Sequence, residues 1–125
     1  MPLQRINPPT LSQPRGFTHV VKSGSHVWIA GQTGRQLDGK VGADITSQAE
    51  QTYKNLGEAL KAAGCSYKDV TKVTVFMTHR EDIEAARAVR AKYFGNTTPA
   101  STLVLVSGLA DPVYRIEVEA TAVVP

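Results

Sequence analysis

The sequence predicts one α+β domain spanning residues 1–125, in which two helices cover one face of a mixed sheet. Apolar residues recur at steps of three and four within residues 45–63 and again within 83–94, as amphipathic helices require. Several β-forming runs, bounded by Gly, Pro and Ser, surround these two segments. A chain of 125 residues can bury one core and is too short for two domains.

The first third of the chain is expected to supply three strands. Prolines crowd residues 1–16, so this segment can hold at most a short edge strand such as Leu3–Ile6. Residues 17–22 and 26–31 are β-forming, and the Ser-Gly-Ser between them predicts a hairpin. The second of these runs leads into residues 30–34, where small side chains allow backbone to approach a ligand or a neighbour.

The middle of the chain predicts a helix, a strand and a second helix. Either Asp44 or Ser47 caps the first helix, and Gly64 ends it. Residues 70–77 alternate as a strand, with Val73, Val75 and Met77 on one face. The second helix is expected from about residue 81 to 94.

Two arginines lie at unusual positions on this second helix. At 100° per residue Arg90 falls inside the apolar arc and Arg87 at its edge. In one interpretation both guanidinium groups reach solvent along their apolar stems. In the other, one of them reaches a buried carboxylate.

Residues 97–124 form two apolar runs that we expect to pair as strands across a loop containing Gly and Pro. Both faces of the first run are apolar: Ser101, Leu103 and Leu105 alternate with Thr102, Val104 and Val106. We expect both faces of such a strand to be covered, one by the helices and the other by a second layer of protein. In a short chain the second cover is plausibly another copy of itself.

Glu117 and Glu119 interrupt the apolar final run, where a carboxylate is costly to bury without a partner. One interpretation places Glu117 on a solvated face or in an ion pair with Arg115. The alternative places it in a pocket.

Composition excludes several classes of protein. The net charge of +3 is spread along the chain, and the eight aromatic residues (three Phe, four Tyr, one Trp) leave few for nucleic-acid stacking, so we expect no nucleic-acid partner. A single cysteine excludes an internal disulfide, and the three histidines lack the spacing of a helical metal site. No segment has the length of a signal peptide or membrane span. We expect a cytoplasmic protein with no membrane partner, no metal and no cofactor.

Four segments are spread over most of the chain, in the order SGSHVWIAGQTG, QTYKNLGEALKAAGCSYKDVTKVTVFM, YFGNTTPAST and RIEVEATA. Together, and in this order, they resemble the Rid family, also called YjgF/YER057c/UK114, the reactive-intermediate deaminases. The resemblance implies a chorismate-mutase-like fold with a six-stranded sheet, and a homotrimer whose small-molecule sites lie in clefts between subunits. It also implies cofactor-free hydrolysis of 2-imino or enamine acids to 2-keto acids and ammonia.

One departure from the family affects the expected substrate. Deaminases of the family carry Pro-Ala-Arg-Ser/Thr, whose arginine grips the substrate carboxylate, whereas this chain has Pro-Ala-Ser-Thr with Ser101 in the arginine position. Loss of that contact removes about 1.5–3 kcal/mol of binding, so ordinary amino-acid-derived imino acids should be poor substrates. Other positions that match family pocket residues but differ in type are Phe17, Ala30, Arg87 and Leu103.

The resemblance implies a site that keeps Gly31 and Glu117, with Glu117 positioning the attacking water. We therefore take Glu117 and Ser101 as candidate catalytic residues. The candidate substrate-binding residues are Phe17, Ala30, Gly31, Arg87, Arg90 and Leu103, with Arg87 or Arg90 returning positive charge to the pocket. Two alternatives to an imine deaminase stay open: a catalytically silent trimeric ligand-binding module, and RNA contact or cleavage.

Overall fold

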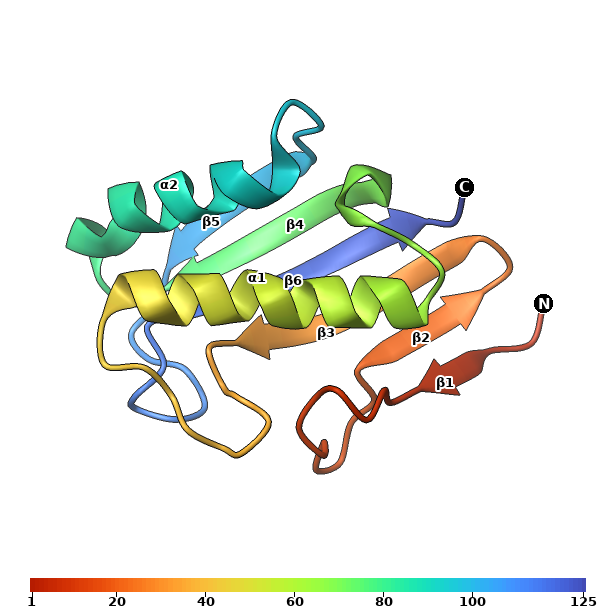
Figure 1. Cartoon of the computed structure of the whole chain (residues 1–125), viewed down its shortest axis with the longest axis horizontal. Coiled ribbons are helices and arrows are strands. Elements are labelled where there is room, and N and C mark those ends of the chain that lie inside the picture. Colours follow the sequence, from red (N-terminus) through yellow and green to blue (C-terminus); the bar gives the residue numbers. More distant parts are fainter.

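The computed structural model describes all residues, 1–125, as a six-stranded sheet with two helices on one face (Figure 1). The sheet order is β1-β2-β3-β6-β4-β5, and every neighbouring pair is antiparallel except β4 and β5. The predicted α+β architecture is confirmed. Its elements are β1 (Gln4–Ile6), β2 (Val20–Ser23), β3 (His26–Thr33), α1 (Ile45–Ala62), β4 (Val70–Met77), α2 (Ile83–Phe94), β5 (Ala100–Leu105) and β6 (Ile116–Val123).

The prediction that the last two strands pair with each other is wrong, because β4 lies between β5 and β6. β4 and β5 are parallel and joined through α2, as parallel neighbours require a crossover. The loop after β5 then returns the chain so that β6 enters the middle of the sheet, antiparallel to both β3 and β4. This order places Glu117 on a central strand and Ser101 on an edge strand.

Strand alternation divides the sheet into a helix-covered face and an open face. Along β4 the predicted alternation is confirmed, since Val73, Val75 and Met77 are at most 2% exposed. Along β6 the residues that face the helices, from Ile116 to Ala122 at every second position, are all buried. Glu117 and Glu119 therefore lie on the open face of the sheet.

A capping hydrogen bond, a 3-10 turn and a glycine mark the ends of the two helices. Asp44 caps α1, because its carboxylate accepts a hydrogen bond from the Ser47 backbone amide at 2.7 Å. Ser47 is therefore not the cap. The second helix starts later than expected, since residues 80–82 form a short 3-10 turn before α2. Gly95 ends α2 with a positive φ of 55°, a conformation that favours glycine.

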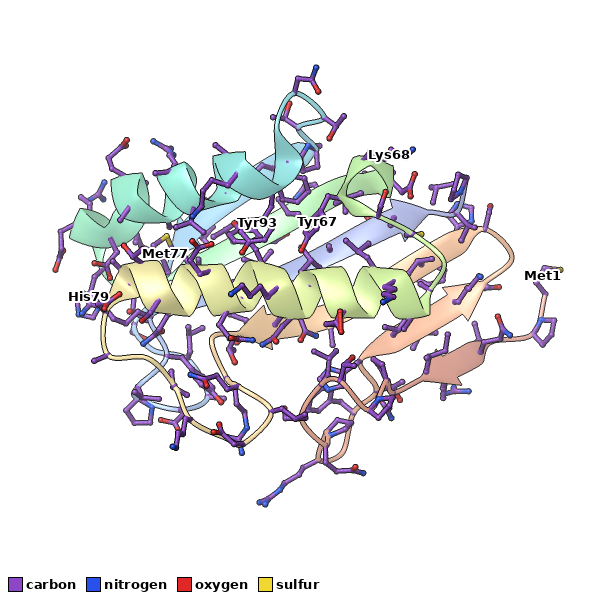
Figure 2. The ribbon with its side chains drawn as sticks, in the orientation of Figure 1. Met1, Tyr67, Lys68, Met77, His79 and Tyr93 are labelled. Carbon is purple, nitrogen blue, oxygen red and sulfur yellow. The ribbon has the colours of Figure 1, made fainter.

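Aromatic side chains fill the layer between the two helices. Figure 2 shows Tyr67 and Tyr93 there, and their ring centroids lie 5.4 Å apart. Tyr53 is 1% exposed and stacks on Tyr93 at 5.7 Å. Neither helix is long and apolar enough to cross a membrane.

The open face of the sheet keeps large apolar side chains in contact with solvent. Trp28, Val104 and Val123 are 47%, 37% and 39% exposed, and all three alternate with residues that face the helices. On edge strand β5, Leu103 packs against the core while Val104 does not. Within one chain β5 is thus covered on one face only.

Gln48 connects α1 to the start of β6. Its side chain is fully buried, and its amide donates hydrogen bonds of 2.9 Å to the carbonyls of Gly42 and Val113. Its carbonyl oxygen accepts from the Arg115 amide at 2.8 Å. These bonds satisfy the backbone of the loop that leads to Glu117.

Substitution of Gln48 tests whether its hydrogen bonds stabilise the loop that leads to β6. We expect Gln48→Met to lower the free energy of unfolding by about 1–3 kcal/mol, because it leaves three partly buried backbone groups without their side-chain partner. The same substitution at Gln51, half-buried on the same helix with one side-chain bond to Asn55, is the matched control. Urea unfolding measures both. Equal losses in the two variants would contradict the assigned role.

Candidate functional site

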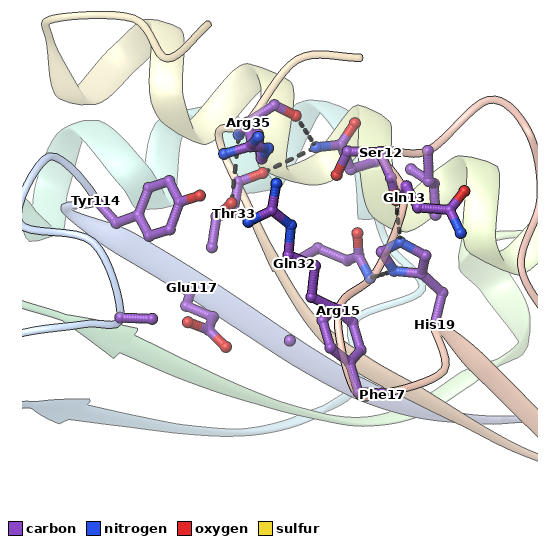
Figure 3. A pocket seen from close by; sticks show the side chains of 14 residues that line it. Ser12, Gln13, Arg15, Phe17, His19, Gln32, Thr33, Arg35, Tyr114 and Glu117 are labelled. Atoms are coloured by element: carbon purple, nitrogen blue, oxygen red, sulfur yellow. Dashed lines mark hydrogen bonds between the residues drawn. The ribbon is translucent and has the colours of Figure 1, made fainter. Parts of the chain in front are cut away.

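A cavity of about 360 Å³ lies beside the ends of β3 and β6. Figure 3 shows Tyr114 and Glu117 on one side of it and the N-terminal segment, with Phe17 and His19, on the other. Gly31 and Thr33 of β3 complete the wall between them. Three of the residues predicted for the site, Phe17, Gly31 and Glu117, therefore line one cavity.

Glu117 is half-buried and has no hydrogen bond or ion pair within the chain. Arg115, its sequence neighbour, bonds instead to Asp82, with 2.7 Å between Nε and Oδ2. The interpretation of Glu117 as a partner of Arg115 is therefore wrong. Burial raises the pKa of Glu117, and the nearby Glu119 carboxylate raises it further.

Gly31 makes room for this carboxylate. It lies where the register between β3 and β6 shifts, between Ile29 and Gln32. A Cβ added at Gly31 would overlap the Glu117 carboxylate and lie 2.7 Å from its carboxyl carbon. A larger residue at position 31 would therefore require the Glu117 side chain to move from this place.

A buried hydrogen-bond chain holds the N-terminal segment against the cavity. His19 is 5% exposed, and its Nε2 lies 2.8 Å from the Ser12 carbonyl. Its Nδ1 accepts from the Gln32 amide at 3.2 Å, while that amide also donates to the Ala30 carbonyl. Phe17 packs edge-on against the His19 ring at 5.3 Å. His19 thus has a structural role in positioning this wall.

The sequence analysis missed most of the cavity lining, including its two arginines, Arg15 and Arg35, and Tyr114. Arg15 and Arg35 lie in irregular segments, where neither periodicity nor a motif marks them. Tyr114 is 9% exposed and lies just before β6. No pattern in the sequence brings these three segments together.

Ser101, Arg87 and Arg90 line a second cavity of about 150 Å³, between α2 and the start of β5. Arg90 donates from Nη1 to the Ser101 hydroxyl at 3.2 Å. Arg87 is exposed and pairs with Glu84 at 3.0 Å. No residue lines both cavities, because β4 separates β5 from β6.

The remaining predicted residues, Ala30 and Leu103, line neither cavity within one chain. Leu103 faces the helices and packs partly into the core. Ala30 is half-buried beside Gly31. The structure also contains no group of three or more His, Cys, Asp or Glu side chains able to hold a metal ion.

The close approach of Gly31 and Glu117 can be measured. We expect Gly31→Ala to destabilise the fold by about 1–3 kcal/mol through overpacking, and this cost to fall by about 1 kcal/mol or more in a Glu117→Ala background. Gly108→Ala is the matched control, because an added Cβ there meets no atom within 4 Å. Additive effects of the two substitutions, measured by urea unfolding, would refute the contact.

Known proteins resemble this chain in sequence along most of its length. The family model described as Endoribonuclease L-PSP matches residues 10–124. A RutC family protein of Pyrococcus horikoshii is 39% identical over 110 residues, which cover 85% of each chain. The 2-iminobutanoate/2-iminopropanoate deaminase of Mus musculus is 34% identical over 111 residues, covering 86% of this chain and 80% of the mouse protein.

Solved structures match the whole architecture. The crystal structure of yeast YEO7 has a TM-score of 0.95 and 26% identity, and the match covers 99% of this chain and 100% of the yeast chain. Escherichia coli TdcF, solved with bound serine, has a TM-score of 0.91 and 29% identity, with 96% and 98% covered. The chain therefore belongs to the Endoribonuclease L-PSP family, the YjgF/Rid family that its sequence resembles.

Proposed function

We propose that this protein is a cofactor-free hydrolase that converts a reactive imine or enamine to a carbonyl compound and ammonia. The observation that carries the proposal is the unpaired, half-buried Glu117 carboxylate in a cavity large enough for a small molecule. Relatives named as imine deaminases, at 34% identity, support the reaction class. The particular imine is not indicated by these names, because this chain differs from the family motif at Ser101.

The chemistry needs one group that can accept and return a proton. Glu117 would take a proton from water as the water oxygen bonds to the imine carbon. The proton then passes to the nitrogen and gives a carbinolamine. Glu117 would next carry the hydroxyl proton of this intermediate to the nitrogen, so that the carbon–nitrogen bond breaks and ammonia leaves behind a carbonyl group. One imine and one water yield one carbonyl compound and one ammonia. A raised pKa brings Glu117 closer to the pH at which the reaction runs.

A second copy of the chain would complete the site. The Glu117 cavity and the Ser101 cavity lie apart in one chain. The family resemblance implies small-molecule sites between the subunits of a homotrimer. The apolar side chains left exposed on the open face, including Trp28 and Val104, are consistent with such packing. In this arrangement Arg90 and Ser101 of one copy would approach Glu117 of the next.

Arg90 is the better candidate to replace the missing arginine of the family motif. Its guanidinium contacts the hydroxyl of Ser101, the residue that stands in the arginine position, whereas Arg87 already pairs with Glu84. Ser101 receives its hydrogen bond from a cation and has no base beside it, so we assign it to substrate binding with Arg90. The serine bound to the TdcF relative is likewise a carboxylate-bearing small molecule.

Two other functions make different predictions. A silent ligand-binding module would hold small anions without hydrolysing imines. An endoribonuclease, as the family model is described, would cleave RNA. Exposed Trp28 and Phe17 offer stacking surfaces, but Trp28 lies on the open face of the sheet with Val104 and Val123, whereas Phe17 lines the Glu117 cavity, so the two do not form one basic aromatic stripe.

Imines generated in place by an amino-acid oxidase test the proposal, with semicarbazide competing for the imine and ammonia release measured. We expect activity that falls by about 100-fold or more in Glu117→Gln, since general acid–base catalysis contributes that much. Arg90→Ala should raise KM, while Arg80→Ala, an exposed arginine outside both cavities, should not.

Three results would change the assignment. Activity that survives Glu117→Gln would refute the role of this carboxylate. A silent parent with an active Ser101→Arg variant would favour the binding module, with only the clamp missing. A monomer in sedimentation equilibrium under assay conditions would contradict a site shared between copies.

A further inference from the structure

We infer that Arg15, Arg35 and Tyr114 form a binding subsite for a second carboxylate, carried on the side chain of the substrate. The inference rests on the proposed function for the identity of the reacting group. It deepens that function by specifying the substrate class: an imine or enamine acid with an additional carboxylate at its far end.

The three residues reach one cavity from three separate segments. Arg15 comes from the N-terminal segment, Arg35 follows β3, and Tyr114 precedes β6. Figure 3 shows the Arg15 guanidinium group and the Tyr114 hydroxyl directed toward the cavity that Glu117 also lines, and Arg35 lines the same cavity. Hydrogen-bond donors thus surround a space next to the proposed catalytic carboxylate.

Neither arginine has an anionic partner in the chain. The ion pairs present are Arg87–Glu84, Lys92–Glu50 and Arg115–Asp82, and none involves Arg15 or Arg35. Glu117 is the only carboxylate that lines the cavity. Two guanidinium groups against one carboxylate leave the cavity positive, and it becomes more positive when Glu117 is protonated. An anion is the ligand that this charge balance favours.

Tyr114 adds a neutral donor to the two arginines. The residue is largely buried, while its hydroxyl makes no hydrogen bond within the chain and is not itself buried. Here the hydroxyl opens onto the cavity, where it can donate to a bound carboxylate.

The segment that carries Arg15 is held in place. Leu11 is 5% exposed and belongs to the core, and the Ser12 carbonyl bonds to buried His19. On the other side of Arg15, the Phe17 ring packs on His19. Arg15 therefore projects from a fixed stretch of backbone, which reduces the entropy lost when it binds an anion.

The subsite is distinct from the position of the family's clamp arginine. That position, Ser101 with Arg90, lies in the other cavity. With Arg90 at one end and the Arg15 and Arg35 pair at the other, the completed site would hold a molecule with an anionic group at each end. Planar guanidinium groups match the geometry of carboxylates, which can accept two parallel hydrogen bonds.

Stable product-like acids test the subsite without requiring catalysis. We expect 2-oxoglutarate to bind about tenfold or more tightly than 2-oxobutanoate, measured by calorimetry at fixed ionic strength, because one charge-assisted contact is worth that factor. Arg15→Ala, Arg35→Ala and Tyr114→Phe should each reduce this preference, and Arg15→Lys should retain part of it. Arg5→Ala, an exposed arginine on β1 outside the cavity, is the matched control.

Equal affinity for the two acids would overturn the inference, and so would an Arg5→Ala variant that loses the preference as strongly as Arg15→Ala. The oxidase assay with glutamate and with 2-aminobutanoate separates this result from the proposed function. Selective binding without hydrolysis of either imine would support the subsite and contradict the deaminase. Hydrolysis of both imines with equal kcat/KM would support the deaminase and overturn the subsite.

Discussion

An unpaired carboxylate on a central strand is the constraint on which the site depends. Glu117 points to the open face of the sheet, and the residue beside it in sequence, Arg115, is already bonded to Asp82. Gly31 on β3 leaves the space that this side chain occupies. A structural carboxylate would normally find a cation, whereas this one is held without one, as acid–base chemistry requires.

The strand order explains why one chain holds two separate cavities. Because β6 enters between β3 and β4, Glu117 meets the N-terminal segment and the end of β3. Because β5 is displaced to the edge, Ser101 meets α2 and Arg90 instead. The topology that buries the core thus separates two groups of polar residues, which only the proposed packing of a second copy would bring together.

Much of the fold followed from local patterns. The alternation of Val73, Val75 and Met77 predicted β4 with its observed bounds, because an apolar residue at every second position is the pattern of a strand with one buried face. Strand pairing was mispredicted for β5 and β6, since alternation shows which face is buried and not which strand lies next to it.

The site was predicted less completely than the fold. Gly31 and Glu117 carry a family motif and could be found from sequence. Arg15, Arg35 and Tyr114 lie in irregular segments whose meeting depends on tertiary structure alone. One interpretation had Arg87 or Arg90 reaching a buried carboxylate, whereas within the chain Arg90 contacts Ser101 and Arg87 pairs with the exposed Glu84.

The most direct test of this account is a site-resolved titration of the Glu117 carboxyl carbon by NMR. The account predicts a pKa above the ordinary value for glutamic acid, which falls when Glu119→Gln removes the neighbouring charge. The folded chain keeps Glu117 protonated to a higher pH than the unfolded chain does. The free energy of unfolding therefore falls as the pH rises from the ordinary pKa of a glutamic acid to the raised pKa of Glu117. A pKa at or below the ordinary value would show a solvated or paired carboxylate, and would contradict the central claim.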